Sequence, residues 1–256
     1  MSQYATAPII SGPPLEGLEN YASVTDVFHT SIERFADKPA FSCMGHTLSF
    51  RELERLSADF TAWLQHETDL QPGDRIAIQL PNVLQFPVAV FGALRAGLVV
   101  VNTNPLYTER EMQHQFEDSG AKAILILANM ADKLERVIER TDIKHVLVTE
   151  LGDLHPFPKR HLINAVVKHI KKMVPRYSLP IAIGFRQALA KGHELEHKEV
   201  ARQPDDVAAL QYTGGTTGLA KGTMLSHCNL VANMLQARSL MSEVLGEGCE
   251  TFIAPL

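Results

Sequence analysis

The middle of the chain alternates short apolar runs with longer amphipathic stretches, and this alternation constrains its fold more than any other feature. Strands that alternate with helices of ten or more residues form βαβ units and a mostly parallel sheet. Right-handed crossovers then favour a doubly wound α/β fold with flanking helices. The predicted strands are residues 75–80, 98–101, 122–127, 145–149 and 207–212, and the predicted helices are residues 82–95, 108–119, 131–140 and 226–241.

Two more helices are predicted before this region. Residues 25–35 place Val27, Phe28, Ile32 and Phe35 at helical spacing. Ser49 and Glu52 form a capping box that opens the next helix. Near the other end of the chain, residues 251–254 have the pattern of a strand at a sheet edge.

A loop rich in Gly and Thr follows the apolar run 207–212 and reads Tyr-Thr-Gly-Gly-Thr-Thr-Gly-Leu-Ala-Lys-Gly. Glycines let a backbone approach an anion and adopt positive φ, and successive N–H groups of such a turn make a concave anion site. Threonine hydroxyls add hydrogen bonds and Lys221 adds a point charge. The loop therefore predicts triphosphate binding between a strand and a helix N-terminus, with a plain surface turn as the alternative. It is not a Walker A loop, because Ala220 precedes and Gly222 follows the lysine.

Composition excludes several functional classes. The net charge of −5 gives no global electrostatic case for nucleic acid as a partner. The cysteines, Cys43, Cys228 and Cys249, have no metal-ligand spacing, and their odd, scattered count is typical of reduced thiols in a cytoplasmic protein. No apolar run reaches about 18 residues, the length of a membrane span, and the N-terminus has no pattern of a secretion signal.

The stretch from Lys159 to Arg176 has six Lys or Arg residues and no Asp or Glu. Its apolar residues recur at helical spacing, and lysines lie on the opposite face. A basic amphipathic helix of this kind can lie in a membrane interface, which would hold the chain at the inner face of the cytoplasmic membrane. The alternative is an ordinary surface helix that packs its apolar stripe on the domain. The apolar positions are Ile163, Val166, Val167, Ile170, Met173 and Val174.

The loop resembles the phosphate-binding signature of the adenylate-forming superfamily, with Gly214 in place of the usual Ser and Ala220 in place of the usual Pro. Other stretches are similar to those of acyl-CoA synthetases, among them residues 91–97 and the His-x-Asn at residues 227–229. Residues 102–108, Asn-Thr-Asn-Pro-Leu-Tyr-Thr, resemble bacterial long-chain fatty-acyl-CoA ligases in particular. The resemblance covers about residues 25–256.

The resemblance implies the N-terminal part of a fatty acid:CoA ligase that uses ATP, Mg²⁺ and coenzyme A. Such enzymes activate a carboxylate as an acyl-adenylate and then transfer the acyl group to coenzyme A. Thr213 is implied as a magnesium ligand, and Lys221 as the charge that screens departing pyrophosphate. The implied ATP-binding residues are Thr213, Gly214, Gly215, Thr216, Thr217, Gly218, Leu219, Ala220, Lys221 and Gly222.

The resemblance also implies that parts of such an enzyme are absent from this chain. The family's Tyr-Gly-x-Thr-Glu motif, its ribose-binding Asp and its catalytic Lys have no counterpart here. We therefore expect the isolated chain to be inactive and to associate with itself. Two alternatives stay open, namely another acyl- or aryl-adenylating enzyme and a non-catalytic module that binds nucleotide or membrane.

The predicted organisation has four parts. Residues 1–24 form an N-terminal arm, and residues 25–150 form a first α/β subdomain. Residues 151–204 form a basic helical insertion or linker. Residues 205–256 begin a second α/β subdomain, which contains the phosphate loop and is cut short.

Overall fold

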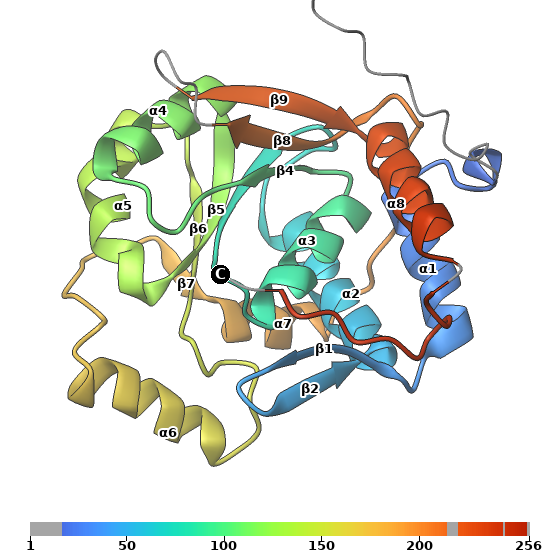
Figure 1. The fold of residues 1–256 in the computed structure, drawn as a ribbon. Coiled ribbons are helices and arrows are strands. Elements are labelled where there is room, and N and C mark those ends of the chain that lie inside the picture. The colour runs from blue at the N-terminus through green and yellow to red at the C-terminus, as the bar shows by residue number, and fades with distance from the viewer. Residues whose placement is uncertain (1–16, 214–219, 243, 255–256) are drawn as a thin grey trace, which may run out of the picture.

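The computed structural model describes residues 17–213, 220–242 and 244–254, and their centre is one seven-stranded sheet (Figure 1). The strand order is β7-β6-β5-β3-β4-β8-β9, and every neighbouring pair is parallel except β8 and β9. The predicted doubly wound, mostly parallel α/β fold is confirmed. The strands are β3 (Arg75–Gln79), β4 (Val99–Asn102), β5 (Ala121–Leu127), β6 (His145–Thr149), β7 (Ala182–Gly184), β8 (Val207–Thr213) and β9 (Lys221–Ser226).

The central strands are apolar because both of their faces are covered. Along β5, Ala123 to Leu127 are all buried, and Ile76 to Ile78 of β3 are fully buried beside them. Because the chain goes from β3 to β4 and then back to β5 on the other side of β3, the winding reverses within the sheet. Ligands of open α/β sheets bind at such a reversal, beyond the carboxyl ends of the strands.

The helices form two layers. α2 (Phe50–Glu67) packs on both α3 (Gln85–Arg95) and α7 (Phe185–Gly192), whereas α4 (Glu109–Ser119) packs on α5 (Ala131–Val137). α1 (Val24–Phe35) lies beside α8 (His227–Met241) at the right of Figure 1. The predicted capping box at the start of α2 is confirmed, since the Ser49 hydroxyl accepts from the Glu52 amide and the Glu52 carboxylate accepts from the Ser49 amide.

Several elements were not predicted from the sequence. A separate hairpin of β1 (Pro39–Cys43) and β2 (His46–Ser49) precedes α2, and β7, α7 and β9 extend the α/β pattern. The predicted strand at residues 251–254 is wrong, because these residues are irregular and pair with no strand. Residues 25–150 and 205–256 contribute strands to the same sheet. The four-part division stays a prediction, and most of its arm, residues 1–16, lies outside the described residues.

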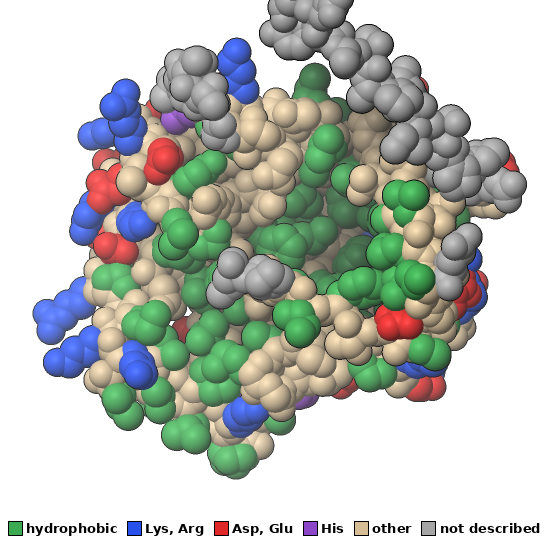
Figure 2. Space-filling model, in the orientation of Figure 1, with side chains coloured by type: hydrophobic (Ala, Val, Ile, Leu, Met, Phe, Trp, Pro, Cys, Tyr) green, Lys and Arg blue, Asp and Glu red, His purple; other side chains and the backbone are tan. Residues whose placement is uncertain are grey.

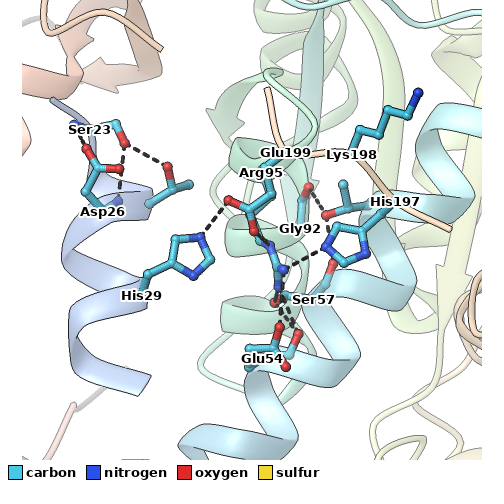
Figure 3. Close-up of polar contacts among 12 residues, drawn as sticks. Ser23, Asp26, His29, Glu54, Ser57, Gly92, Arg95, His197, Lys198 and Glu199 are labelled. Atoms are coloured by element: carbon cyan, nitrogen blue, oxygen red, sulfur yellow. Dashed lines mark hydrogen bonds and ion pairs between the residues drawn. The ribbon is translucent and has the colours of Figure 1, made fainter. Parts of the chain in front are cut away.

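A buried arginine ties the segment before β8 to the helical layer (Figure 3). The Arg95 side chain is 2% exposed, and its guanidinium donates to Glu199 Oε1 at 2.8 Å, to Ser57 Oγ at 2.8 Å and to the Glu54 carbonyl at 2.9 Å. His29 of α1 bonds the other oxygen of Glu199 at 2.6 Å. These bonds join α1, α2, α3 and residues 197–199, and they compensate the buried charge.

The predicted basic helix is present but differs in its packing. It begins as α6 (Lys159–Ala165) and continues as a π-helical turn, Val166–Ile170, in which the Lys171 amide donates to the Val166 carbonyl. A π turn holds an extra residue, so it rotates the residues after it away from the α-helical stripe. Val167 is buried, but Ile170 and Met173 are exposed, so the prediction of one packed apolar stripe is wrong for these two residues.

Candidate functional site

The predicted phosphate loop connects two antiparallel strands at the sheet edge. Strands β8 and β9 pair Thr213 with Lys221 and Tyr212 with Gly222. The predicted site residues Gly214, Gly215, Thr216, Thr217, Gly218 and Leu219 lie outside the described residues. The hairpin register therefore places the exposed Thr213 and Lys221 opposite each other, directly at the two ends of the loop.

Position 222 requires glycine, because a side chain there would collide with the Tyr212 ring. A Cβ atom at Gly222 would lie 2.9 Å from two ring atoms of Tyr212, which is closer than real Cβ contacts. The ring cannot easily retreat, because its hydroxyl donates to Asp118 Oδ2 at 2.5 Å. Burial, followed by the Asp118 carboxylate, raises the pKa of Tyr212, so the hydroxyl stays a donor at neutral pH.

Helix α4 holds both ends of the loop. Asp118 accepts from Tyr212 at the β8 end, and His114 Nε2 bonds the Ala220 carbonyl at 3.0 Å at the β9 end. Because a carbonyl only accepts, Nε2 of His114 is the donor. The two side chains are four residues apart, so they lie on one face of α4. This arrangement fixes the two ends of the loop.

The helix that follows the loop does not supply the anion site predicted there. β9 separates the loop from α8, so the order is strand, loop, strand, helix. The first amides of α8 already have protein acceptors: His227 donates to the Asp206 carbonyl, Cys228 to the Pro204 carbonyl, and Asn229 to the Ser226 hydroxyl. The N-terminus of α8 therefore has no unpaired amide at residues 227–229 to offer to a phosphate.

His227 has a structural role. It is buried, and its Nδ1 accepts from the Val24 amide at 3.2 Å, which ties α8 to α1. Burial, followed by the nearby Arg202 guanidinium, lowers the pKa of His227, so the ring is neutral and can accept this bond.

Polar side chains near the ends of β4 and β8 join these two strands. Asn102 Nδ2 donates to Gln211 Oε1 at 3.1 Å, and Gln115 of α4 donates to the Asn102 carbonyl. Asn104 forms a turn, since its Oδ1 accepts from the Leu106 amide. Asn102 is instead the last residue of β4.

The described residues offer little to a divalent cation on their own. No group of three His, Cys, Asp or Glu side chains in residues 17–213, 220–242 and 244–254 is arranged to hold a metal. Thr213, exposed at the end of β8, presents one hydroxyl oxygen, a ligand type that suits Mg²⁺. Because Mg²⁺ usually keeps waters and phosphate oxygens as its other ligands, one protein oxygen here fits a cation that arrives with a nucleotide.

The comparison with known proteins decides the family. A family model described as AMP-binding enzyme matches residues 28–256. The chain belongs to the AMP-binding, adenylate-forming family. It is 49% identical over 238 residues to the long-chain-fatty-acid–CoA ligase of Escherichia coli O157:H7, covering 93% of this chain and 42% of that protein. It is 48% identical over 231 residues to the Haemophilus influenzae ligase of the same description, covering 90% of this chain and 41% of that protein.

The fold agrees with this family assignment. A crystal structure of a long-chain-fatty-acid-CoA ligase from Archaeoglobus fulgidus superposes with a TM-score of 0.67 at 23% identity, covering 86% of this chain and 40% of that one. The chain therefore has the fold of the N-terminal part of adenylate-forming enzymes. It spans about two fifths of the length of the curated relatives it matches, namely 42% of the Escherichia coli ligase and 41% of the Haemophilus influenzae ligase.

Two features of the candidate site were not predicted from the sequence, although a signal for each was present. The β9 strand follows a Gly-rich connection after β8, which is a pattern typical of a hairpin. The α4 contacts come from His114 and Asp118, whose i, i+4 spacing predicts a shared face but not what that face contacts.

Proposed function

We propose that the protein carrying this chain is an ATP-dependent, AMP-forming long-chain fatty acid:CoA ligase. The 49% identity to a ligase of that name is the observation that carries the proposal. In this reaction the fatty acid carboxylate forms an acyl-adenylate with release of pyrophosphate, and the coenzyme A thiolate then displaces AMP. Positioning and charge neutralisation are the main contributions of a protein to such chemistry.

In this proposal the β8–β9 hairpin binds the β- and γ-phosphates. Lys221 neutralises pyrophosphate as it departs, and the loop amides and threonine hydroxyls donate to phosphate oxygens. The support from the structure is that Thr213 and Lys221 are exposed and paired at the loop ends. Thr213 is proposed as one oxygen ligand of a Mg²⁺ ion bound together with ATP.

The proposal also covers partners and location. Fatty acid and coenzyme A are the substrates, and the protein works in the cytoplasm with peripheral contact to the inner face of the cytoplasmic membrane through residues 159–176. Within residues 17–213, 220–242 and 244–254, no helix is long and apolar enough to cross a membrane. Self-association is proposed through the exposed side chains of Leu240, Phe252 and Ile253, which would be covered in an oligomer.

The test is AMP release by the natural protein that carries this chain, with its length first established by intact mass. Palmitate and a cinnamic acid are compared as substrates in the presence of ATP, Mg²⁺ and coenzyme A. Palmitate-dependent AMP release supports the proposal. Release with the aryl acid alone would identify a different adenylating enzyme. ATP binding without release from either acid would identify a non-catalytic nucleotide-binding module.

A further inference from the structure

Four large apolar side chains stand exposed around α6. Phe157 is 79% exposed, Leu162 66%, Ile170 71% and Met173 57%. They are interleaved with six Lys and Arg residues and no acidic residue between positions 159 and 176. We call this surface the α6 patch, and Figure 2 shows its hydrophobic and basic side chains together at the lower left. A protein rarely leaves several large apolar side chains exposed together unless the surface has a partner.

Polar contacts on the inner side of α6 attach the helix to the domain. Asn164 accepts from the Gly152 amide through Oδ1 at 2.7 Å and donates to Asp153 through Nδ2 at 3.1 Å. Lys159 Nζ donates to the carbonyls of Met44 and Gly45 in the β1–β2 turn. The helix is thus anchored to the domain largely through polar residues, and part of its apolar surface points to solvent.

The π turn sets this orientation. In an uninterrupted α-helix, Ile170 would lie near Ile163 and Val167 and would pack with them. The extra residue of the π turn moves Ile170 out of that row, and the Met173 amide instead donates to the Val167 carbonyl. Ile170 and Met173 therefore join Leu162 on the exposed side, beside Lys168 and Lys171.

We propose that the α6 patch docks the chain on a bilayer that contains anionic lipid, with Leu162, Ile170 and Met173 entering the interface and the lysines contacting the headgroups. Exposed apolar side chains flanked by Lys and Arg are the combination that such an interface binds. The charge is local, because the chain as a whole has a net charge of −5. The inference deepens the proposed function by naming the lipid class and the side chains, and it rests on that function only for the location.

A second copy of the chain is a poor occupant of this surface. In a two-fold symmetric contact the same patch meets itself. The exposed Lys168, Lys171 and Lys172 would then face the same lysines of the other copy, with no acidic residue of the patch between them. Anionic lipid headgroups instead supply the opposite charge, and acyl chains cover the apolar side chains.

The test is co-sedimentation of the chain with vesicles of phosphatidylcholine alone and of phosphatidylcholine with about 30% phosphatidylglycerol, which supplies the anionic surface. The apolar variant is Leu162→Ser with Ile170→Ser. Its control is Leu106→Ser, between β4 and α4, where the residue is 85% exposed and lies outside the α6 patch. The charge variant is Lys168→Glu with Lys171→Glu. Its control, Arg110→Glu with Lys144→Glu, reverses two exposed charges elsewhere.

We expect wild type to bind the anionic vesicles and to bind phosphatidylcholine much more weakly. Each basic residue near an anionic surface contributes about fivefold to partitioning, so the charge variant should lose at least about tenfold. The apolar variant should also lose about tenfold in vesicle binding, because it lacks two apolar side chains that would be buried in the lipid interface. Both controls should bind as wild type does, and all variants should keep the wild-type urea midpoint.

Three results would overturn the inference. The first is equal binding of wild type to both vesicle types. The second is binding at the wild-type level by both patch variants. The third is a wild-type dimer that binds no vesicles and that dissociates when Leu162 and Ile170 are replaced by Ser. ATP binding is measured on the same preparations, because the patch and the loop are separate surfaces. If vesicle binding is absent while ATP still binds, the membrane inference and the proposed peripheral location fail, and the proposed ligase activity stands.

Discussion

Replacement of Arg95 by Met should destabilise the chain strongly, because it removes the buried cation that Glu54, Ser57 and Glu199 share. Arg95 is 2% exposed, whereas the carboxylates of Glu54 and Glu199 are each 35% exposed. Removing one partner of a buried ion pair costs about 3–5 kcal/mol. Because both carboxylates reach water, we expect the lower end, about 3 kcal/mol, which for a chain of this size lowers Tm by about 6–12 °C.

The assay is thermal and urea unfolding followed by the fluorescence of Trp63, the single tryptophan, which is buried in α2 and stacks near Phe60. The control is Arg51→Met in α2, because the Arg51–Asp37 pair is exposed and should contribute little. A loss below about 1 kcal/mol for Arg95→Met would refute the reasoning, since it would mean that the network does not compensate a desolvated charge.

The remaining predictions concern the loop stems and one buried histidine. Gly222→Ala should lower the unfolding free energy by about 1–3 kcal/mol, because its Cβ would collide with the Tyr212 ring. Gly184→Ala is the control, because a Cβ there would have no atom nearer than 4.0 Å, and equal urea midpoints for the two variants would contradict the contact. His114→Leu should lower ATP affinity several-fold through a less ordered loop stem while changing stability by about 1 kcal/mol or less; an unchanged calorimetric affinity would show that the α4 contact is dispensable. Because burial lowers the pKa of His227 below its ordinary 6.5, the folded state binds the proton less well than the unfolded state, so its contribution is full above about pH 6.5 and is lost as pH falls below that value. The unfolding free energy should therefore drop between pH 7.5 and 5.5 and drop less in His227→Asn; identical pH profiles would contradict this assignment.

The sequence predicted the elements that local patterns specify. Apolar runs flanked by helical patterns identified β3, β4, β5, β6 and β8, and Ser49 with Glu52 identified the start of α2. These features depend on neighbouring residues only, so they are visible before any tertiary contact is known.

The features that the sequence did not predict depend on partners distant in the chain. β9 is a strand because β8 offers it an edge, and residues 251–254 are irregular because no strand pairs with them. The exposure of Ile170 follows from one π-helical turn, which apolar spacing does not reveal. At the candidate site, the loop pattern predicted Thr213 and Lys221, but only the fold shows that His114 and Asp118 contact the two ends of the loop.

Equilibrium binding of ATP to the wild-type chain and to Lys221→Ala, measured by calorimetry with Mg²⁺ present, tests the central claim most directly. A charge-assisted contact to phosphate is worth about 1.5–3 kcal/mol, so the account predicts that Lys221→Ala binds ATP at least about tenfold more weakly. Lys144→Ala, which removes an exposed lysine away from the loop, should bind as wild type does. Equal affinity of wild type and Lys221→Ala would contradict the assignment of the β8–β9 hairpin as the triphosphate site.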